Sequence, residues 1–215
     1  MPEHPPTDDL AGLLLSQWSG RGLMRTFKPD PVPDRAVSDM ERAAMAGPRV
    51  GDPARERLVF VSDPGLRAEL GDALCKGLNR INFWVRSAPL IIMALSRQAM
   101  VDRLRSIDGE RFDLIQALER IASSAQTHGL GSCPVLGFDG REVKRVLSAR
   151  EGWRVVAALA VGYPGLTGEE VFGISVISDF HEYYHRLRER LDRRAGTARD
   201  YMVVHNRFRH GRKSS

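Results

Sequence analysis

The hydrophobic positions of the chain alternate between helical spacing and short continuous runs. From Phe112 to Ala125, apolar residues recur every three or four positions, and this spacing predicts a helix with one buried face. Gly129 follows where the glycine that ends a helix is expected. The runs at 58–61, 88–95 and 155–161 are almost wholly apolar, which is typical of buried strands. The pattern therefore predicts a helix and at least three strands in the middle of the chain.

Further helices are predicted before and between these strands. Asp34 is a candidate cap for a helix that runs to Ala46. Another helix is predicted over 66–78, a third begins after Asp139, and 96–111 is expected to be polar and irregular. Strands separated by helices indicate a layered sheet with helices on both faces, although the order and direction of the strands do not follow from the pattern.

Charge separates the C-terminal end from the rest of the chain. The net charge is +5 over 215 residues, and the stretch from Arg186 to Ser215 alone carries ten Lys/Arg and three Asp/Glu. We therefore expect a disordered N-terminus at 1–9, one domain at 10–178, and a basic helix and arm at 179–215. Short helices are expected at residues 9–18 and 180–194, and one more strand at 201–205.

The composition excludes several classes of protein. No apolar run is long enough to cross a bilayer, and the polar, proline-rich N-terminus has no signal-peptide pattern. Cys75 and Cys133 are far apart and form no metal-binding or redox motif. These features predict a reduced, cytoplasmic protein without a membrane span.

Four motifs stand out against this background. They are Arg25-Thr26-Phe27-Lys28-Pro29-Asp30-Pro31-Val32-Pro33, Gly129-Leu130-Gly131-Ser132-Cys133, Pro134-Val135-Leu136-Gly137-Phe138 and Gly162-Tyr163-Pro164. Together they resemble the FMN-dependent nitroreductase family, over roughly residues 13–164. The resemblance implies an α+β fold, with a nitroreductase-like mixed sheet flanked by helices. It also implies an intertwined homodimer with one flavin in each of two sites at the interface.

The first motif resembles the segment that holds the FMN phosphate in that family, where an Arg-Ser-x-Arg sequence precedes the proline-rich stretch. Arg25 falls on the second arginine, Leu23 occupies the serine position, and Arg21 lies one residue before the place of the first arginine. Arginine suits phosphate because its planar fork of N–H donors matches the phosphate oxygens. The resemblance therefore implies a phosphate site at Arg21, Leu23 and Arg25.

The loop after Pro48 resembles another flavin-contacting segment in its spacing. Arg49 stands where the family usually has serine, and Asp52 stands where it has asparagine. An aspartate beside the N1 region of a reduced flavin is electrostatically unfavourable unless it is paired. The resemblance also places Asn82 near the pyrimidine edge of the flavin, whereas its residue type equally suits a turn or a cap.

The resemblance is most specific at Val135, Leu136 and Gly137. In the family this bend contacts the isoalloxazine through its backbone, including an N–H group directed at N5, and a glycine there lets the backbone approach a flat ring. The same residues also suit a tight turn. No Lys or Arg follows between residues 165 and 180, so a further phosphate ligand is expected from near Arg186 or from the partner's tail.

The leading hypothesis is an FMN-dependent oxidoreductase that transfers hydride through flavin N5 to or from a small organic substrate. NADH, NADPH or an oxidisable substrate supplies the hydride, and no side chain is assigned as catalytic because the flavin performs the chemistry. One alternative is a flavin-dependent dehydrogenase subunit similar to cyclic dipeptide oxidases, some of which need a small partner protein. The other is a nitroreductase-like scaffold that has lost flavin and acts in binding or assembly.

Two further features are interpreted without assigning them a function. His181-Glu182-Tyr183-Tyr184-His185 matches the HExxH pattern of zinc proteases, but the usual third ligand is missing, so no metal is expected. The basic tail has few aromatic residues and matches no known module, so nucleic-acid binding is not expected.

Overall fold

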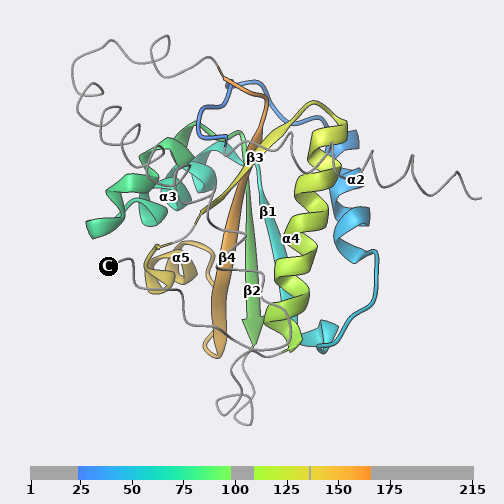
Figure 1. Ribbon diagram of the computed structural model, residues 1–215. Coiled ribbons are helices and arrows are strands. Elements are labelled where there is room, and N and C mark those ends of the chain that lie inside the picture. The colour runs from blue at the N-terminus through green and yellow to red at the C-terminus, as the bar shows by residue number, and fades with distance from the viewer. Residues whose placement is uncertain (1–23, 98–108, 136, 166–215) are drawn as a thin grey trace, which may run out of the picture. The chain divides into compact units, whose positions relative to one another are not determined.

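Four strands form one sheet in the order β1-β2-β4-β3, and every neighbouring pair is antiparallel (Figure 1). The strands are β1 (Glu56–Val61), β2 (Leu90–Arg97), β3 (Gly131–Val135) and β4 (Trp153–Gly162). The three predicted apolar runs lie largely within β1, β2 and β4, which confirms them as strands. The resemblance implied a mixed sheet, whereas the three strand pairings of the described residues are all antiparallel.

The computed structural model describes residues 24–97, 109–135 and 137–165. The elements expected at 9–18, 180–194 and 201–205 lie outside this part of the chain, as do the domain limits predicted at residues 9 and 178. Within the described ranges, none of the helices has the length and apolar character that a membrane crossing requires.

The central strands β2 and β4 are covered on both faces. Every residue of β2 from Leu90 to Ser96 is buried, and so is every residue of β4 from Ala157 to Gly162. Leu90 pairs with Val161 at one end, and the register shifts once, between Ala94 and Leu95. Burial on both faces favours apolar residues at every position, which explains why the runs at 90–95 and 155–161 are continuously apolar in sequence.

The two faces of the sheet are covered by different helices (Figure 1). One face packs against α3 (Pro64–Leu74), the 3-10 segment η2 (Gly77–Ser87) and α5 (Gly140–Val146), and we call it the α3 face. The other packs against α2 (Asp34–Met45) and α4 (Gly109–Thr127), and we call it the α4 face. Helices on both faces and an α+β class are as predicted.

Two helices differ from their predicted limits. The helix predicted over 66–78 ends at Leu74, and the chain continues as η2. The stretch 96–111 is not wholly irregular, because β2 extends to Arg97 and α4 begins at Gly109. The start of α4 buries Glu110 and Asp113, so polar residues occupy the inward positions where the apolar spacing of the helix begins.

The helix ends are fixed by local hydrogen bonds. Gly129 has a φ of +70°, and the N–H of Leu130 donates to the carbonyl of Ala125, which confirms the predicted glycine at the end of α4. Asp139 accepts from the N–H of Arg141 at the start of α5. Asp34 is not the cap of α2, because Pro33 occupies the capping position and Asp34 is the first helical residue.

The segment 24–28 lies against the end of β4. Phe27 forms an isolated antiparallel bridge with Pro164. The N–H of Lys28 donates to the carbonyl of Tyr163 at 3.0 Å, and the N–H of Gly165 donates to the carbonyl of Thr26 at 2.9 Å. These bonds fix the position of the extended segment that contains Arg25.

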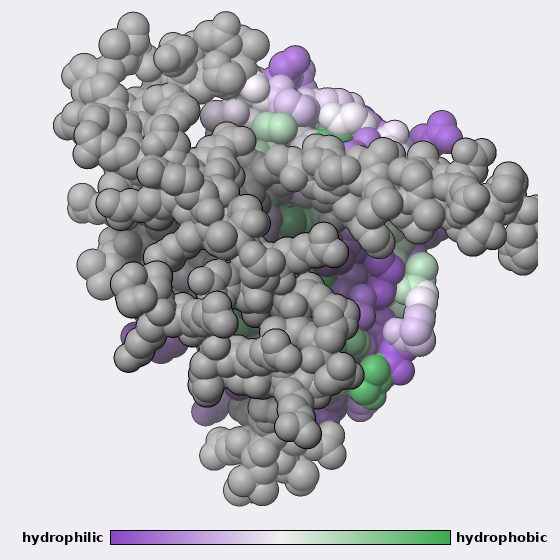
Figure 2. All heavy atoms as spheres, in the orientation of Figure 1, coloured by the Kyte–Doolittle hydropathy of each residue, from purple (hydrophilic) through white to green (hydrophobic). Residues whose placement is uncertain are grey.

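Four large apolar side chains remain exposed around the end of α2 and the first half of α4. They are Met45, Val50, Phe112 and Ile115, and we call them the Val50 patch. Val50 adjoins α4 directly, because its N–H donates to the carboxylate of Asp113. Figure 2 shows hydrophobic residues at the right-hand border of the molecule, where α2 and the loop after it lie in Figure 1.

Asp39 connects α2 to the end of α4 and is expected to stabilise the fold in a pH-dependent way. A hydrogen bond from Arg42, together with His128 Nε2 at 2.9 Å from Oδ2, holds the pKa of Asp39 below its ordinary value. A lowered folded-state pKa means that this stabilisation is present above the unfolded pKa, about 4, and is lost as the pH falls through the folded value.

The measurement is the free energy of unfolding in urea for the wild type and Asp39→Asn, from neutral pH to below about pH 4. The wild type should be more stable at neutral pH, and the difference should shrink in acid. Asp30→Asn, at an exposed position, is the control. A difference that does not change with pH would contradict the role of the Asp39 charge.

Candidate functional site

The guanidinium group of Arg25 lies between an aromatic ring and a thiol on the α3 face. Its central carbon is 5.8 Å from the centroid of the Trp84 ring, a distance at which a cation is attracted to an aromatic face. Trp84 is only 7% exposed, and Cys133 on β3 is 1% exposed. Arg25 therefore brings a positive charge to the edge of a hydrophobic core.

Cys133 is a neutral neighbour of this arginine. Burial raises the pKa of the Cys133 thiol, while the hydrogen bond and positive charge of Arg25 act in the opposite direction. Burial also raises the pKa of Cys75. Both thiols are free and protonated at neutral pH, so neither has the low pKa of a reactive cysteine.

The bend predicted after β3 is present. Val135 ends the strand with its side chain buried, and Gly137 has a φ of +70°, which glycine adopts without a steric penalty. Phe138 then packs on the α3 face, and Asp139 begins α5. Leu136 lies outside the described residues. The bend is on the same face of the sheet as Arg25, and its contact with a flavin remains a prediction.

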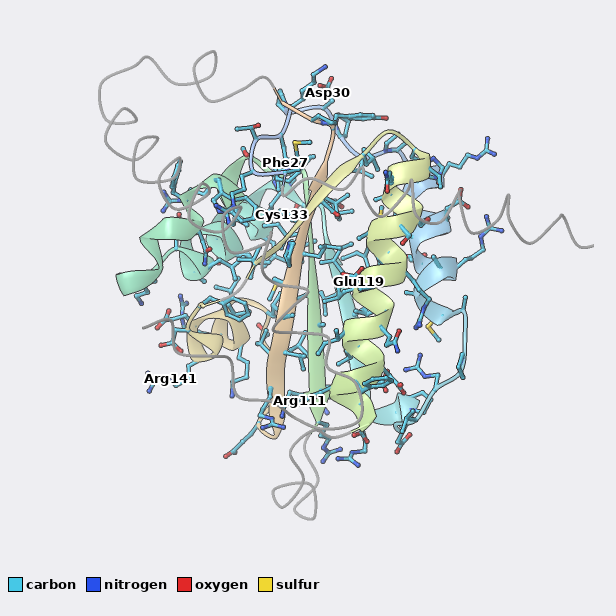
Figure 3. All side chains as sticks on the ribbon, in the orientation of Figure 1. Phe27, Asp30, Arg111, Glu119, Cys133 and Arg141 are labelled. Carbon is cyan, nitrogen blue, oxygen red and sulfur yellow. The ribbon has the colours of Figure 1, made fainter. Side chains whose placement is uncertain are left out.

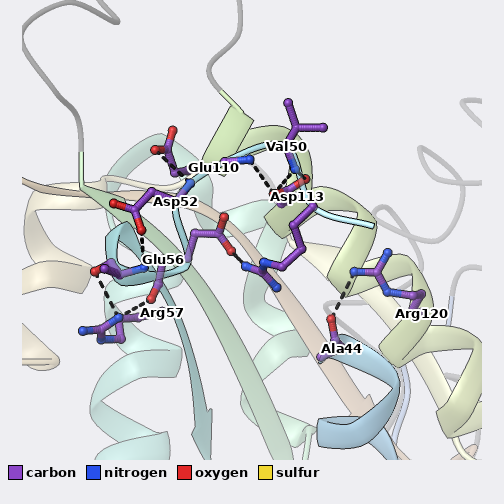
Figure 4. A network of polar contacts seen from close by, with 11 residues as sticks. Ala44, Val50, Asp52, Glu56, Arg57, Glu110, Asp113 and Arg120 are labelled. Carbon is purple, nitrogen blue, oxygen red and sulfur yellow. Dashed lines mark hydrogen bonds and ion pairs between the residues drawn. The ribbon is translucent and has the colours of Figure 1, made fainter. Parts of the chain in front are cut away.

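The loop of residues 48–55 is bound to the first turns of α4 (Figure 4). The carboxylate of Asp113 accepts hydrogen bonds from the N–H groups of Val50 and Gly51, both at 2.8 Å. A Cβ atom on Gly51 would lie 2.5 Å from the backbone nitrogen of Glu110, so only glycine fits there. The loop and the helix therefore pack backbone to backbone.

The side chains of Arg49 and Asp52 have partners within this loop and β1. Arg49 forms an ion pair with Glu56, which is 7% exposed. Asp52 accepts a hydrogen bond from the N–H of Ala54 at 2.9 Å and caps the short turn η1 (Pro53–Arg55). Pro48 is exposed. The two residues that replace the family's serine and asparagine therefore have structural roles in this protomer.

Two buried acidic residues of α4 were not predicted from the sequence. Glu110 forms an ion pair with Arg55 at 2.8 Å, and Asp113 binds the backbone of the loop. Arg55 also donates to the carbonyl of Arg97 at the end of β2. The available signal was the spacing of Glu110 and Asp113, which places both on the inward side of α4 together with its apolar stripe.

Asn82 caps the end of a helix. It is 6% exposed, and its side-chain Nδ2 donates to the carbonyl of Leu74, the last residue of α3, at 3.2 Å. This contact matches the turn-or-cap role that its residue type left open. A contact between Asn82 and a flavin remains a prediction.

Two parts of the predicted site, Arg25 and the 48–55 loop, lie at opposite ends of the sheet. Arg25 adjoins the end of β4, whereas the 48–55 loop adjoins the end of β2 at Arg97. The eight residues of β2 span about 23 Å at roughly 3.3 Å per residue. Figure 3 shows the same separation, with Phe27 and Cys133 toward the upper end and Arg111 at the lower end. Arg21 and Leu23 lie outside the described residues.

Comparison with known proteins shows which family has these features. The model of the "Nitroreductase family" matches residues 76–163. A 5,6-dimethylbenzimidazole synthase of Rhodobacter capsulatus is 30% identical over 176 residues, which cover 68% of this chain and 81% of that protein. The chain belongs to the nitroreductase family. An NADH dehydrogenase of Thermus thermophilus is 25% identical over 181 residues, covering 69% of this chain and 85% of its own length.

Solved nitroreductases share the fold. A nitroreductase family protein from Clostridium novyi NT has a TM-score of 0.62 and 19% identity, and the match covers 70% of this chain and 84% of that chain. An FMN-dependent nitroreductase from Clostridium difficile R20291 has a TM-score of 0.60 and 20% identity, covering 71% and 88%. As a member of this family the chain is an oxidoreductase.

Nitroreductases typically bind flavin, and the described residues fit that cofactor in part. The Arg25 cation suits the phosphate, and a glycine bend such as that at Gly137 lets the backbone approach a flat ring. Arg49 and Asp52 fit less directly, because their side chains are used within the protomer. Within the described ranges, no group of three or more side chains could hold a metal ion, and residues 181–185 lie outside them.

Asp113 is expected to hold the 48–55 loop in place. In Asp113→Asn the amide keeps one oxygen acceptor but loses the charge and brings an NH2 group toward two backbone donors. A charged hydrogen bond contributes roughly 1.5–3 kcal/mol, so we expect a loss of stability of about that size. Amide hydrogen exchange at Val50 and Gly51 should accelerate more than exchange in β2 and β4.

Asp63→Asn is the matched control for this change. Asp63 accepts from the N–H of Leu66 at the exposed start of α3, where asparagine caps as well as aspartate. Its stability should stay near that of the wild type. Unchanged exchange at Val50 and Gly51 in Asp113→Asn would show that the loop does not depend on this carboxylate.

Proposed function

We propose that this nitroreductase is an FMN-dependent oxidoreductase that transfers hydride between a nicotinamide or other reductant and a small organic substrate. FMN supplies the hydride chemistry at its N5 atom when it is bound. Arg25 binds the phosphate, and the backbone at Val135–Gly137 lies against the ring. The observation that supports the proposal most is the guanidinium of Arg25, held on the same sheet face as the Gly137 bend.

Two copies of the chain build each site in this proposal. Arg25 and the 48–55 loop are at opposite ends of the sheet within one protomer, so a pocket that contains both takes the loop from a partner. Nitroreductases generally form homodimers. The Val50 patch is exposed beside the same loop, and apolar surface of this kind marks protein interfaces.

Related proteins support the choice of reaction. The Thermus relative is named an NADH dehydrogenase, which favours a nicotinamide as the reductant. The Rhodobacter relatives are named 5,6-dimethylbenzimidazole synthases, which favours a small organic molecule as the substrate. On the protein side, Arg25 binds and orients, and the bend at Gly137 excludes water from one face of the ring.

Arg25→Ala tests the phosphate assignment. Removing a charged hydrogen-bonding partner of a phosphate should weaken FMN binding roughly tenfold or more. The measurement is FMN affinity by fluorescence quenching, together with the visible absorption that desalted protein retains. Arg141→Ala, at an exposed position on α5, is the matched control and should bind FMN like the wild type.

Two outcomes would contradict this proposal at different levels. Wild-type protein that retains no added FMN would overturn the flavin-dependent function and favour the scaffold alternative. If the wild type and Arg25→Ala bind FMN with the same affinity, Arg25 does not bind the phosphate. The flavin-dependent function would then still stand.

The Val50 patch is expected to lie in the dimer interface. Phe112→Lys and Ile115→Lys replace half-exposed side chains, so each protomer should still fold while a charge is placed at the contact. Sedimentation should show a shift from dimer to monomer, accompanied by weaker FMN binding. Glu69→Lys, at an exposed position on α3, is the control for a change of charge elsewhere. Unchanged dimers in both patch variants would place the interface on another surface.

A further inference from the structure

Trp84 is buried in η2 and contacts two residues of the 24–28 segment. Its ring centroid lies 6.4 Å from that of Phe27, at an interplanar angle of 38°, and 5.8 Å from the guanidinium carbon of Arg25. Arg25 and Phe27 are two residues apart, which in an extended segment directs both side chains to the same side. One aromatic ring therefore contacts both the apolar and the charged side chain of this segment.

An arginine that binds phosphate benefits from being held in place beforehand. A free arginine side chain has many rotamers, and this conformational entropy is lost when it orients on a ligand. The backbone of the segment is already fixed by the hydrogen bonds of Lys28 and Gly165. The ring of Trp84 restricts the side chain as well, because a guanidinium group stacks on an aromatic face.

Two of the neighbours of Arg25 carry no negative charge. An indole ring carries no negative charge, and burial keeps the Cys133 thiol protonated. A carboxylate in either place would form an ion pair with the guanidinium and weaken its attraction for an anion. These two neighbours therefore contact the cation without supplying a negative charge.

We propose that Trp84 is a positioning residue that orients Arg25 toward the phosphate of FMN and so makes the site selective for a phosphorylated flavin. The proposal rests on the FMN-dependent function proposed above. It assigns a role to a residue that lies outside the predicted site, in the 3-10 segment between α3 and β2. Trp84 need not touch the flavin to have this effect.

The test compares the affinities of FMN and riboflavin, which differ only in the phosphate. The ratio of the two dissociation constants reports the phosphate contact, whereas a general loss of folding lowers both affinities together. Trp84→Leu should reduce the wild-type preference for FMN by roughly tenfold, the effect of a desolvated cation–aromatic contact. Trp84→Phe retains a weaker aromatic face and should give an intermediate preference.

Two further variants complete the design. Phe27→Leu removes the other ring that contacts Trp84 but keeps the cation, so its preference for FMN should match the wild type. In an Arg25→Ala background, Trp84→Leu should cause no further loss of preference, because the residue acts through Arg25.

The results distinguish this proposal from the function on which it rests. If the wild type prefers FMN over riboflavin and both Trp84→Leu and Trp84→Phe keep the full preference, Trp84 does not orient Arg25. That result would overturn the role of Trp84 and leave the flavin-dependent function in place. An equal loss for both flavins would also overturn it, because Trp84 would then serve only the core. Wild-type protein that binds neither flavin would overturn both proposals.

Discussion

The pairing of β2 with β4 is the constraint on which the rest of this structure depends. Both strands are buried on both faces along most of the pairing, so the sheet needs helices on each side, and the chain supplies α3 and α5 for one face and α2 and α4 for the other. From Leu90 to Leu95 on β2 and from Val155 to Gly162 on β4 the pair carries no polar side chain, which leaves no room for chemistry in the middle of the pairing. The charged residues of these two strands lie at one end of the pairing, and the two ends are about 23 Å apart along β2.

The two ends differ in their electrostatics. At one end the Arg25 cation lies against two neutral groups, a ring and a protonated thiol. At the other end three buried carboxylates are used within the protein: Glu56 and Glu110 pair with arginines, and Asp113 binds backbone N–H groups. A buried charge is tolerated only when it is compensated in this way. The first arrangement suits the binding of a ligand, whereas the second suits the attachment of a loop.

The sequence predicted the layers better than the limits of the elements. Buried strands are visible as apolar runs because burial on both faces excludes polar residues. The start of α4 was missed because Glu110 and Asp113 are buried through contacts with a loop some sixty residues earlier, and no local pattern reveals such partners. The candidate site shows the same limit. The motifs made Arg25 and Gly137 candidates, and their contact with a flavin stays a prediction. The cap formed by Asn82 and the contact made by Trp84 could not be predicted, because they depend on packing between distant segments.

The burial of both cysteines makes the protein well suited to spectroscopic labelling. The chain contains only Cys75 and Cys133, which are 6% and 1% exposed, and burial raises the pKa of both thiols. Maleimide and spin-label reagents react with accessible thiolates, so the native protein gives little background. A cysteine introduced at a surface position becomes a selective attachment point without removal of the natural ones. In the proposed homodimer, distances between labels on the two protomers can then be measured in solution, with and without flavin.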